Sequence, residues 1–458
     1  MRTSMITLTK QLYSSCNTNS RTTWYSIAIA IAIINSLLFY PGLFSNDSFD
    51  QIGQALNNTY RTWHPVPLTI LMHYLIPWLG IGGILIINQV LYWIFISLFC
   101  DTLIKKNYIF YIIGYFPPIF INTIAIFKDI TSMACCLLGI IILALYEKTN
   151  KTQLKLLITS ITFLLLGTIV RWNSFLVSST IIFIYYILFH NKEKHTVKKA
   201  TAFVFIFFGV CSLTLQGINT IYSAKKENPL PTLMLWDIAG ICKFSNIHCP
   251  LPSYIEITDK KLSENWLNNY NSDTCSFCWN SGISCNLSQK YSSSILLKDW
   301  IKNIKAHPFS YLKHRWELTK GLFGLRRMVY YSHHRYDQNF QAGDIYKPNQ
   351  LGLKSFLRLE KIGYFCQKIF IYHPIIWMIV SVISIPYAYT HLKRSSTKLE
   401  QIQLKCVIIL ASSGLVNAFS LCILAPAADY RYMLYTVISG LLSMLLVLWR
   451  YNLKTLDK

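Results

Sequence analysis

Charged residues are scarce in this sequence, and acidic residues are the scarcest of them. Only 14% of the 458 residues are charged, and 20 Asp and Glu stand against 43 Lys and Arg. Hydrophobic residues make up 53% of the chain, and the mean hydropathy is +0.36. A soluble protein of this length does not need so much apolar surface. The composition therefore excludes an ordinary soluble fold and indicates a membrane protein with several transmembrane segments.

Glycine-rich phosphate-binding motifs are missing as well. The sequence has neither the P-loop pattern nor the spaced glycines of a dinucleotide-binding turn. It also lacks a clear internal repeat, which transporters built from two related halves show. These absences disfavour chemistry that uses ATP or a nucleotide sugar, and they weaken the interpretation as a transporter.

Ten apolar segments are candidates for membrane spans. In chain order they are residues 24–44, 81–103, 108–127, 130–146, 156–170, 174–189, 200–222, 369–390, 406–425 and 432–449. The first is longer than the core of a cleaved signal peptide, so we expect it to be retained. The predicted fold class is an all-α polytopic membrane protein with about ten transmembrane helices.

The distribution of Lys and Arg predicts the orientation. Short basic loops, such as the one with Lys105 and Lys106, follow every second segment, and such loops stay in the cytoplasm. Both termini are then cytoplasmic, and the formal net charge of +23 reflects orientation rather than a nucleic-acid partner. The alternation requires that residues 66–78, bounded by Pro65 and Pro77, form a helix on the outer membrane surface instead of a span.

This topology divides the chain into three parts. Residues 1–222 are expected to form an N-terminal transmembrane module that includes a first outer loop at residues 45–80. Residues 223–366 contain no convincing span and are long enough for a mixed extracytoplasmic domain. Residues 367–458 complete the chain with C-terminal transmembrane helices.

Several of the 13 cysteines lie in the predicted extracytoplasmic domain, where an oxidising compartment favours disulfides. The expected pairs are Cys242 with Cys249, and Cys275 or Cys278 with Cys285. The alternative for the CSFC motif at residues 275–278 is half of a zinc site, although a second CxxC pair is missing.

Ionisable residues that orientation does not explain gather in four predicted outer loops. The first loop contains Asp47, Asp50, Arg61 and His64, and taken alone it could be a solvated loop. The other three loops each contribute a pair next to a span end: Lys128 with Asp129, Arg171 with Asn173, and Asp429 with Arg431. Taken singly, each pair could be only a local salt bridge. Taken together, they suggest a site at one depth in the membrane.

Short motifs in these loops resemble those of the GT-C superfamily of membrane glycosyltransferases, particularly the protein-mannosyltransferase and aminoarabinose-transferase types. The motifs are NDSFDQ from Asn46, WHPVPLTILMHYL from Trp63, FKDI from Phe127, VRWN from Val170, WDIAG from Trp236, HPFSYLKHRW from His307 and DYRY from Asp429. The resemblance implies a sugar donor carried on polyprenyl phosphate, inversion at the anomeric carbon, and a catalytic or metal-associated carboxylate at Asp47. The adjacent acidic pair usual in that superfamily is replaced here by Asp47 and Asp50.

The hypothesis that follows is a transferase reaction at the outer membrane face. Asp47 would act as general base, with Asp50 or His64 orienting the acceptor or binding a divalent metal ion whose ligands are left open. The leaving phosphate would be held by Lys128, Arg171 and Arg431, and supported by Asp129, Asn173 and Asp429. The acceptor would be a glycan, a lipid or a protein in the cell envelope, and the location a bacterial inner membrane. Cations and histidines of the late outer region would select the acceptor or meet anionic headgroups: His307, His314, Arg315, Arg326 and Arg327.

Three alternatives are open at this stage. An O-antigen ligase or polymerase would also have many spans, but its chemistry would lie in the late loop around His307 and Arg315. A lipid or glycan transporter would perform no bond chemistry and would place ionisable residues within spans. An inactive scaffold could retain the architecture alone.

Overall fold

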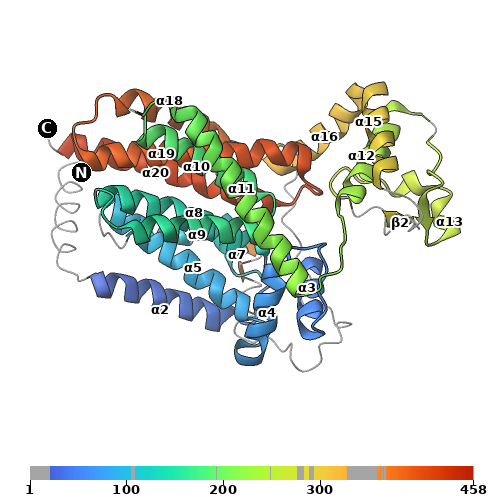
Figure 1. The fold of residues 1–458 in the computed structure, drawn as a ribbon, viewed down its shortest axis with the longest axis horizontal. Coiled ribbons are helices and arrows are strands. Elements are labelled where there is room, and N and C mark those ends of the chain that lie inside the picture. The colour runs from blue at the N-terminus through green and yellow to red at the C-terminus, as the bar shows by residue number, and fades with distance from the viewer. Residues whose placement is uncertain are drawn as a thin grey trace.

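The chain is described here from a computed structural model. It describes residues 21–104, 109–191, 193–247, 249–275, 283–287, 293–326, 354, 358–359, 361–363, 365 and 368–456. Within these residues the protein is almost entirely helical, and long helices lie side by side in a bundle (Figure 1).

The bundle is built from helices in both halves of the chain. In chain order these are α2 (Arg21–Phe39), α5 (Gly83–Phe99), α6 (Ile109–Gly114), α7 (Pro117–Thr123), α8 (Lys128–Lys148), α9 (Leu154–Val170), α10 (Ser174–Phe189), α11 (Thr196–Ile221), α18 (Pro374–Leu392), α19 (Lys398–Leu424) and α20 (Leu434–Leu456). A π-helical turn, η1 (Cys100–Ile104), extends α5, and the 3-10 turns η4 (Phe370–Tyr372) and η5 (Tyr430–Met433) precede α18 and α20.

Seven of the described helical segments are long and apolar enough to cross a membrane. They are Thr22–Phe39, Gly83–Ile104, Lys128–Lys148, Thr196–Ile221, Pro374–Leu392, Lys398–Leu424 and Tyr430–Arg450. The coarse prediction of an all-α membrane protein is therefore confirmed, whereas the number of ten spans stays a prediction. Helices α9 and α10 lie at two predicted spans, but they have only 17 and 16 residues.

The predicted span at residues 108–127 is not a continuous helix. It consists of α6 and α7, and α7 begins with Pro117 at its first position, where proline is well accommodated. Because proline disfavours helical geometry in the residue before it, Phe116 adopts φ −54° and ψ 114° and separates the two helices. These residues were predicted as one span, and the structure has a complete break between the two helices.

Helix α8 is the centre of the bundle, because almost every one of its side chains is buried. Small residues let α9 approach it closely. The hydroxyl of Ser132 donates to the carbonyl of Gly167 at 2.7 Å, and the hydroxyl of Ser160 donates to that of Gly139 at 2.7 Å. Such pairs of small and hydroxyl residues are typical of helices that associate within a membrane.

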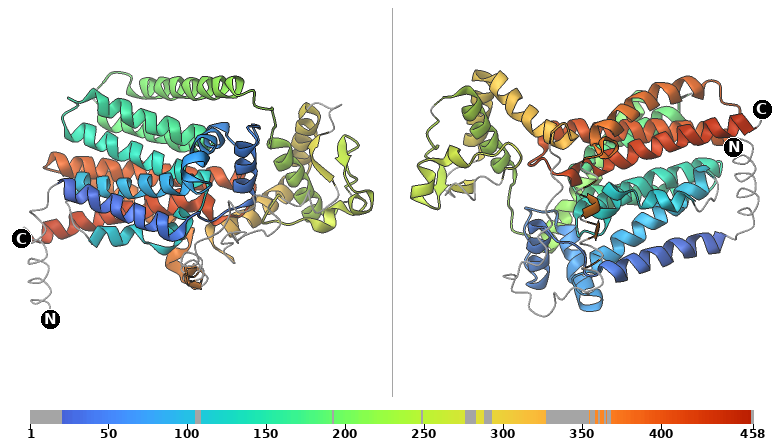
Figure 2. Two further views of the ribbon diagram at one scale, coloured as in Figure 1. Left: turned by 90° about the horizontal axis from the view of Figure 1, so that it is seen from below. Right: turned by 180° about the vertical axis from the view of Figure 1, so that it is seen from behind.

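Helix α11 lies at the edge of the bundle, as Figure 2 shows in the view from below. Its Phe205 and Leu213 side chains are 69% and 71% exposed, although the helix is strongly apolar. An apolar face that no protein covers is the expected surface of a helix in contact with lipid.

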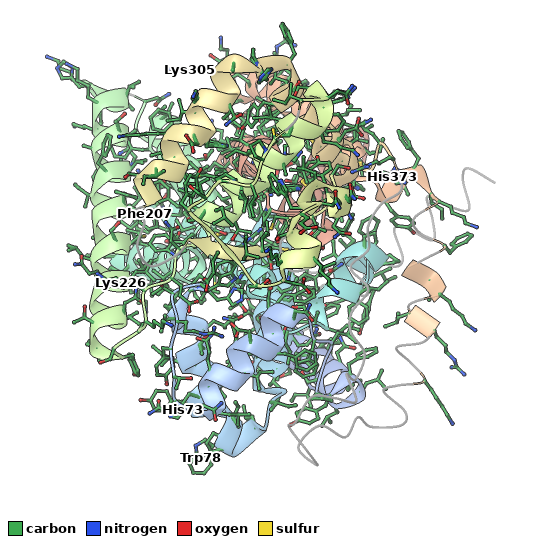
Figure 3. All side chains as sticks on the ribbon, turned by 90° about the vertical axis from the view of Figure 1, so that its right-hand side faces the viewer. His73, Trp78, Phe207, Lys226, Lys305 and His373 are labelled. Carbon is green, nitrogen blue, oxygen red and sulfur yellow. A yellow bond between two sulfur atoms is a disulfide. The ribbon has the colours of Figure 1, made fainter. Side chains whose placement is uncertain are left out.

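The two ends of the bundle differ. The first described residues and the C-terminus lie at one end, and α3 (Asn46–Leu56) and α4 (Val66–Leu79) lie at the other and run across the bundle direction (Figure 1). That residues 66–78 form a helix is therefore confirmed. Trp78 near the end of α4 is 86% exposed and points away from the molecule in Figure 3. An exposed tryptophan on such a helix fits an interface between lipid and water.

The described residues between 230 and 326 form a small unit beyond the end that carries α3 and α4 (Figure 1). Its elements are α12 (Leu230–Ser245), β1 (Ile255–Ile257), α13 (Lys260–Ser263), the 3-10 turn η2 (Trp266–Asn269), β2 (Ile283–Leu287), α15 (Ser293–Ala306) and α16 (Pro308–Phe323). Strands β1 and β2 pair antiparallel, with Ile255 opposite Leu287.

One predicted disulfide is confirmed in this small unit. Cys242 and Cys249 are bonded, with their Cα atoms 6.0 Å apart. The second predicted pair joins Cys275 or Cys278 with Cys285. Cys278 lies outside the described residues and the side chain of Cys285 is likewise not described, so this pair stays a prediction.

Candidate functional site

Helix α3 places Asp47 at the end of the bundle that carries α3 and α4. Ser45 caps the helix: its hydroxyl accepts from the Ser48 amide at 3.2 Å, and the Ser48 hydroxyl accepts from the Ser45 amide at 3.2 Å. The Ser48 hydroxyl also donates to the Ile126 carbonyl at 2.6 Å, which ties α3 to the segment before α8. Asp47 lies in the first turn of α3, where a negative charge is favoured by the helix dipole.

Asp47 is surrounded by basic side chains from three other parts of the chain. Its Oδ2 atom lies 3.0 Å from Nη2 of Arg431 and 3.9 Å from Nζ of Lys128. Its Oδ1 atom lies 4.0 Å from Nε2 of His64. Burial raises the pKa of Asp47, but the charges of Arg431 and Lys128 and the hydrogen bond from Arg431 outweigh burial and hold it below its usual value. Asp47 is therefore a carboxylate at neutral pH.

His64 is neutral and bridges the acidic and basic groups. Its Nδ1 atom lies 2.7 Å from Nζ of Lys128, so this nitrogen accepts and the proton lies on Nε2. Nε2 faces Asp50 at 3.7 Å as well as Asp47. Burial, followed by the charge of Lys128, lowers the pKa of His64 to about 3. The imidazole can orient the carboxylates, but it has no lone pair left for a metal ion.

Asp50, one helical turn after Asp47, is held by other side chains of the first loop. Its carboxylate forms an ion pair with Arg61 and accepts from Nε2 of Gln54 at 2.7 Å. Arg61 also lies 3.8 Å from Oε1 of Glu227, in the segment that leads from α11 to the small unit. The first loop is therefore fixed by ionic contacts on both of its sides.

Arg431 enters the site from the segment between α19 and α20. Its Nε atom lies 2.9 Å from Oδ2 of Asp429, and its guanidinium lies over the rings of Phe127 and Tyr432, at 5.0 Å and 5.2 Å from their centroids. Burial raises the pKa of Asp429 to about 6, although the charge of Arg431 opposes that shift. Arg431 thus lies between two carboxylates, those of Asp47 and Asp429.

A second, fully buried ion pair lies beside the site. Nε of Arg171, at the end of α9, lies 2.8 Å from Oδ1 of Asp129 in the first turn of α8. The Arg171 guanidinium also lies over the Tyr432 ring, 5.3 Å from its centroid. Asn173 is the N-cap residue of α10, but its side chain makes no capping hydrogen bond.

Predicted residues from all four loops thus come together at the end of the bundle that carries α3 and α4, whereas Asn173 is placed only as the N-cap residue of α10. Comparisons with protein-family models, with curated proteins and with solved structures found no match to this chain.

The predicted metal ion stays a prediction. Within the part of the chain that the structure describes, no group of three or more His, Cys, Asp or Glu is arranged to hold a metal. The carboxylate oxygens of Asp47 and Asp50 are the groups that could bind one, since oxygen ligands suit Mg²⁺ and Mn²⁺.

The predicted residues of the late region occupy another place. His314 and Arg315 are buried against Asp237, and Arg326 forms an ion pair with Asp273. His307 is the N-cap residue of α16. Arg327 lies outside the described residues.

Sequence reasoning missed several residues that shape the site. Phe127 and Tyr432 contact the guanidinium of Arg431, and each is a chain neighbour of a predicted cation. That position in the sequence was the available signal. Gln54 and Glu227 had no such signal, because an amide and a distant carboxylate are recognised only once the loops are folded.

Proposed function

We propose that this protein is a membrane glycosyltransferase that moves a sugar from a polyprenyl-phosphate donor to a hydroxyl of an acceptor. The observation that carries the proposal is the group around Asp47, where a partly exposed carboxylate meets Arg431 and Lys128. Asp47 is 33% exposed, whereas Lys128 and Arg431 are 17% and 7% exposed. In the proposal, the acceptor hydroxyl approaches the carboxylate, and the donor phosphate is held by the two cations beside it.

The proposed step is a single displacement at the sugar C1 atom. The acceptor oxygen forms a bond to C1 while the bond from C1 to the phosphate oxygen breaks, and the phosphate leaves with the electron pair. Asp47 takes the proton of the attacking hydroxyl. Lys128 and Arg431 stabilise the charge that develops on the leaving phosphate.

Binding of the donor would also prepare Asp47 for its task. A carboxylate held by two cations is a weak base, because its proton affinity is low. The contact of Lys128 with Asp47 is loose, at 3.9 Å. When the donor phosphate attracts Lys128, Asp47 loses part of this neighbouring charge, and its pKa rises towards the range of a working base.

The remaining predicted residues have supporting roles in this proposal. His64 orients Asp47 and Asp50 through its Nε2 proton. Arg171, which is paired with Asp129, stabilises the ring of Tyr432 against Arg431 rather than binding phosphate itself. We place the site at the outer face of a bacterial inner membrane, where polyprenyl donors would approach laterally and the acceptor would be a cell-envelope glycan, lipid or protein.

The test is transfer by the purified protein in liposomes that contain a polyprenyl-phosphate donor with a labelled sugar. Label in covalent linkage to an acceptor supports a transferase, whereas label that only changes bilayer side supports a transporter. We expect Lys128→Ala to lower kcat/KM for the donor about tenfold to a hundredfold, the range of a lost charged hydrogen bond. Lys320→Ala removes a cation that only pairs with Glu317 on the surface of α16, and serves as the matched control.

The same assay separates the ligase or polymerase alternative. That alternative predicts loss of transfer in His307→Ala and unchanged transfer in Lys128→Ala. The transferase proposal predicts the reverse.

A further inference from the structure

Residues 425–429, which lead from α19 to Arg431, are held by the small unit through consecutive backbone groups. The amide of Cys275 donates to the carbonyl of Pro426 at 2.8 Å, and the amide of Ala428 donates to the carbonyl of Asp273 at 2.7 Å. Thr274 forms an antiparallel bridge with Ala427. The short segment before Arg431 is therefore paired with residues 273–275 through three backbone contacts.

Arg315 on α16 completes this hold from the other side. Its Nη1 atom donates to the Ala425 carbonyl at 3.2 Å. Its Nη2 atom lies 2.7 Å and 2.8 Å from the two carboxylate oxygens of Asp237 on α12. One guanidinium thus joins two helices of the small unit to the end of α19.

The position of Arg315 is itself fixed by a buried group of hydrogen bonds. Asp237, which is fully buried, also accepts from Nε1 of Trp300 at 2.9 Å and lies 3.0 Å from Nε2 of His314. Tyr270 donates its hydroxyl to Nδ1 of His314 at 2.6 Å. Buried side chains with several hydrogen-bond partners move little, so Arg315 offers a rigid contact to the Ala425 carbonyl.

The same unit is connected to the other half of the site through its entry segment. The Lys225 amide donates to the Tyr60 carbonyl at 2.8 Å, and the Thr62 amide donates to the Lys225 carbonyl at 3.0 Å. The Glu227 amide donates to the hydroxyl of Thr62 at 2.7 Å. Figure 3 views this end of the molecule and labels Lys226 within the segment that makes these contacts.

We propose that the small unit sets the distance between Asp47 and Arg431, and that Arg315 is the positioning residue through which it acts. The two residues come from opposite ends of the chain and meet at 3.0 Å. The small unit contacts residues 425–428, close to Arg431, and the segment that leads into it at residues 225–227 contacts residues 60–62 of the first loop, which carries Asp47. Its geometry therefore acts on the separation of the two residues. This inference rests on the proposed transferase function and assigns a role in it to a residue that does not touch the substrate.

The test is Arg315→Lys, which keeps a cation against Asp237 but cannot also reach the Ala425 carbonyl. We expect kcat for sugar transfer to fall about tenfold to a hundredfold, as for other small misplacements of reacting groups, with little change in KM for the donor. Hydrogen exchange of the amides at residues 425–431 should become faster. In an Arg431→Lys background the further loss of kcat should be small, because both changes act through one contact. Lys320→Ala on the same helix is the control, with unchanged kcat and exchange.

Unchanged kcat in Arg315→Lys would overturn the inference, whether or not the exchange changed. If the wild-type protein transfers no sugar, the proposed function fails, and hydrogen exchange then becomes the test of the role of Arg315. In that case faster exchange at residues 425–431 supports the hold on Arg431, and unchanged exchange overturns it.

Discussion

Asp47 is more exposed than the basic groups that surround it. Its side chain is 33% exposed, whereas those of Lys128, His64 and Arg431 are 17%, 6% and 7% exposed. A substrate therefore meets the carboxylate first, and the cations act from a region with little water. Charges interact more strongly in such a region than in solvent, which favours catalysis by fixed electrostatic groups.

The buried carboxyl of Asp429 predicts a pH dependence for sugar transfer. Its pKa is raised from 3.8 to about 6, so it becomes protonated and neutral as the pH falls through 6. Arg431 then loses one of its two carboxylate partners, and we expect the rate to fall on the acid side of pH 6. His64, with a pKa of about 3, stays neutral through this range and adds no change of its own.

The measurement is the pH profile of kcat between pH 5 and 8 for the wild type and for Asp429→Asn. The variant should lose the decrease near pH 6 and show a lower, flat rate. An unchanged decrease in the variant would assign it to a different group.

The buried pair of Asp129 and Arg171 predicts a large effect on stability. Removal of one partner leaves a buried charge without compensation, which costs about 3–5 kcal/mol in other proteins. We expect Arg171→Met alone to lower the unfolding free energy by about this amount. Arg171→Met with Asp129→Leu should recover most of the loss, as measured by thermal unfolding in detergent. A loss below about 1 kcal/mol in the single variant would mean that water reaches the pair.

At the scale of residues, the sequence predicted which charges lie close together but not how they pair. Asp47, His64, Lys128 and Arg431 were singled out because they lie outside spans in a chain with few charges, and the structure brings them together. Arg171 was expected to bind phosphate beside Arg431. In the structure it is buried against Asp129. This pairing depends on the packing of α8 against α9, and neither the FKDI motif nor the VRWN motif specifies it.

At the scale of elements, helix α3 carries Asp47, and its start depends on two serines. Ser48→Ala would remove the reciprocal cap with Ser45 and leave the buried carbonyl of Ile126 without its donor. We expect a loss of about 1–2 kcal/mol in unfolding free energy and a lower kcat, since Asp47 is the next residue.

Thr397→Ala provides the control for this prediction. Thr397 caps α19 by accepting from the Glu400 amide at 3.2 Å, and it lies at the other end of α19 from residues 425–429. It should cost similar stability while kcat stays unchanged. Equal kcat in both variants would show that the start of α3 does not position Asp47.

Proline had different consequences in different elements. Pro117 and Pro308 begin helices α7 and α16, where the fixed φ angle of proline suits the first helical position. Pro77 and Pro386 lie inside helices, where proline removes a hydrogen bond. The sequence does not distinguish these outcomes, because neighbouring helices decide whether the helix continues past the proline. This is why residues 108–127 were predicted as one span.

At the scale of the whole molecule, the arrangement predicts which sites face each side of the membrane. The first and last described residues lie at one end of the bundle, and α3, α4 and the small unit lie at the other (Figure 1). Labelling with a membrane-impermeant maleimide tests this arrangement. Lys226→Cys and Lys305→Cys should react from outside the cell, and Lys151→Cys only after permeabilisation, with the unsubstituted chain as control. Equal reaction of all three in intact cells would contradict the orientation.

The contact between the chain halves was beyond sequence reasoning for a physical reason. Asp47 and Arg431 are separated by 384 positions, and no local pattern specifies such a pairing. The sequence did predict that their loops share one side of the membrane, because the positive loops alternate. Their distance depends on the packing of α19 and α20 and on the small unit.

The most direct test of the central claim is single-turnover transfer of labelled sugar by purified wild type, Asp47→Asn and Asp259→Asn. Asp259→Asn makes the same chemical change in the exposed cap of α13, far from the chemistry. The account predicts a loss of about a hundredfold or more in Asp47→Asn, with donor binding retained and Asp259→Asn at the wild-type rate. Transfer by Asp47→Asn at the wild-type rate would contradict the assignment of the reaction to this site.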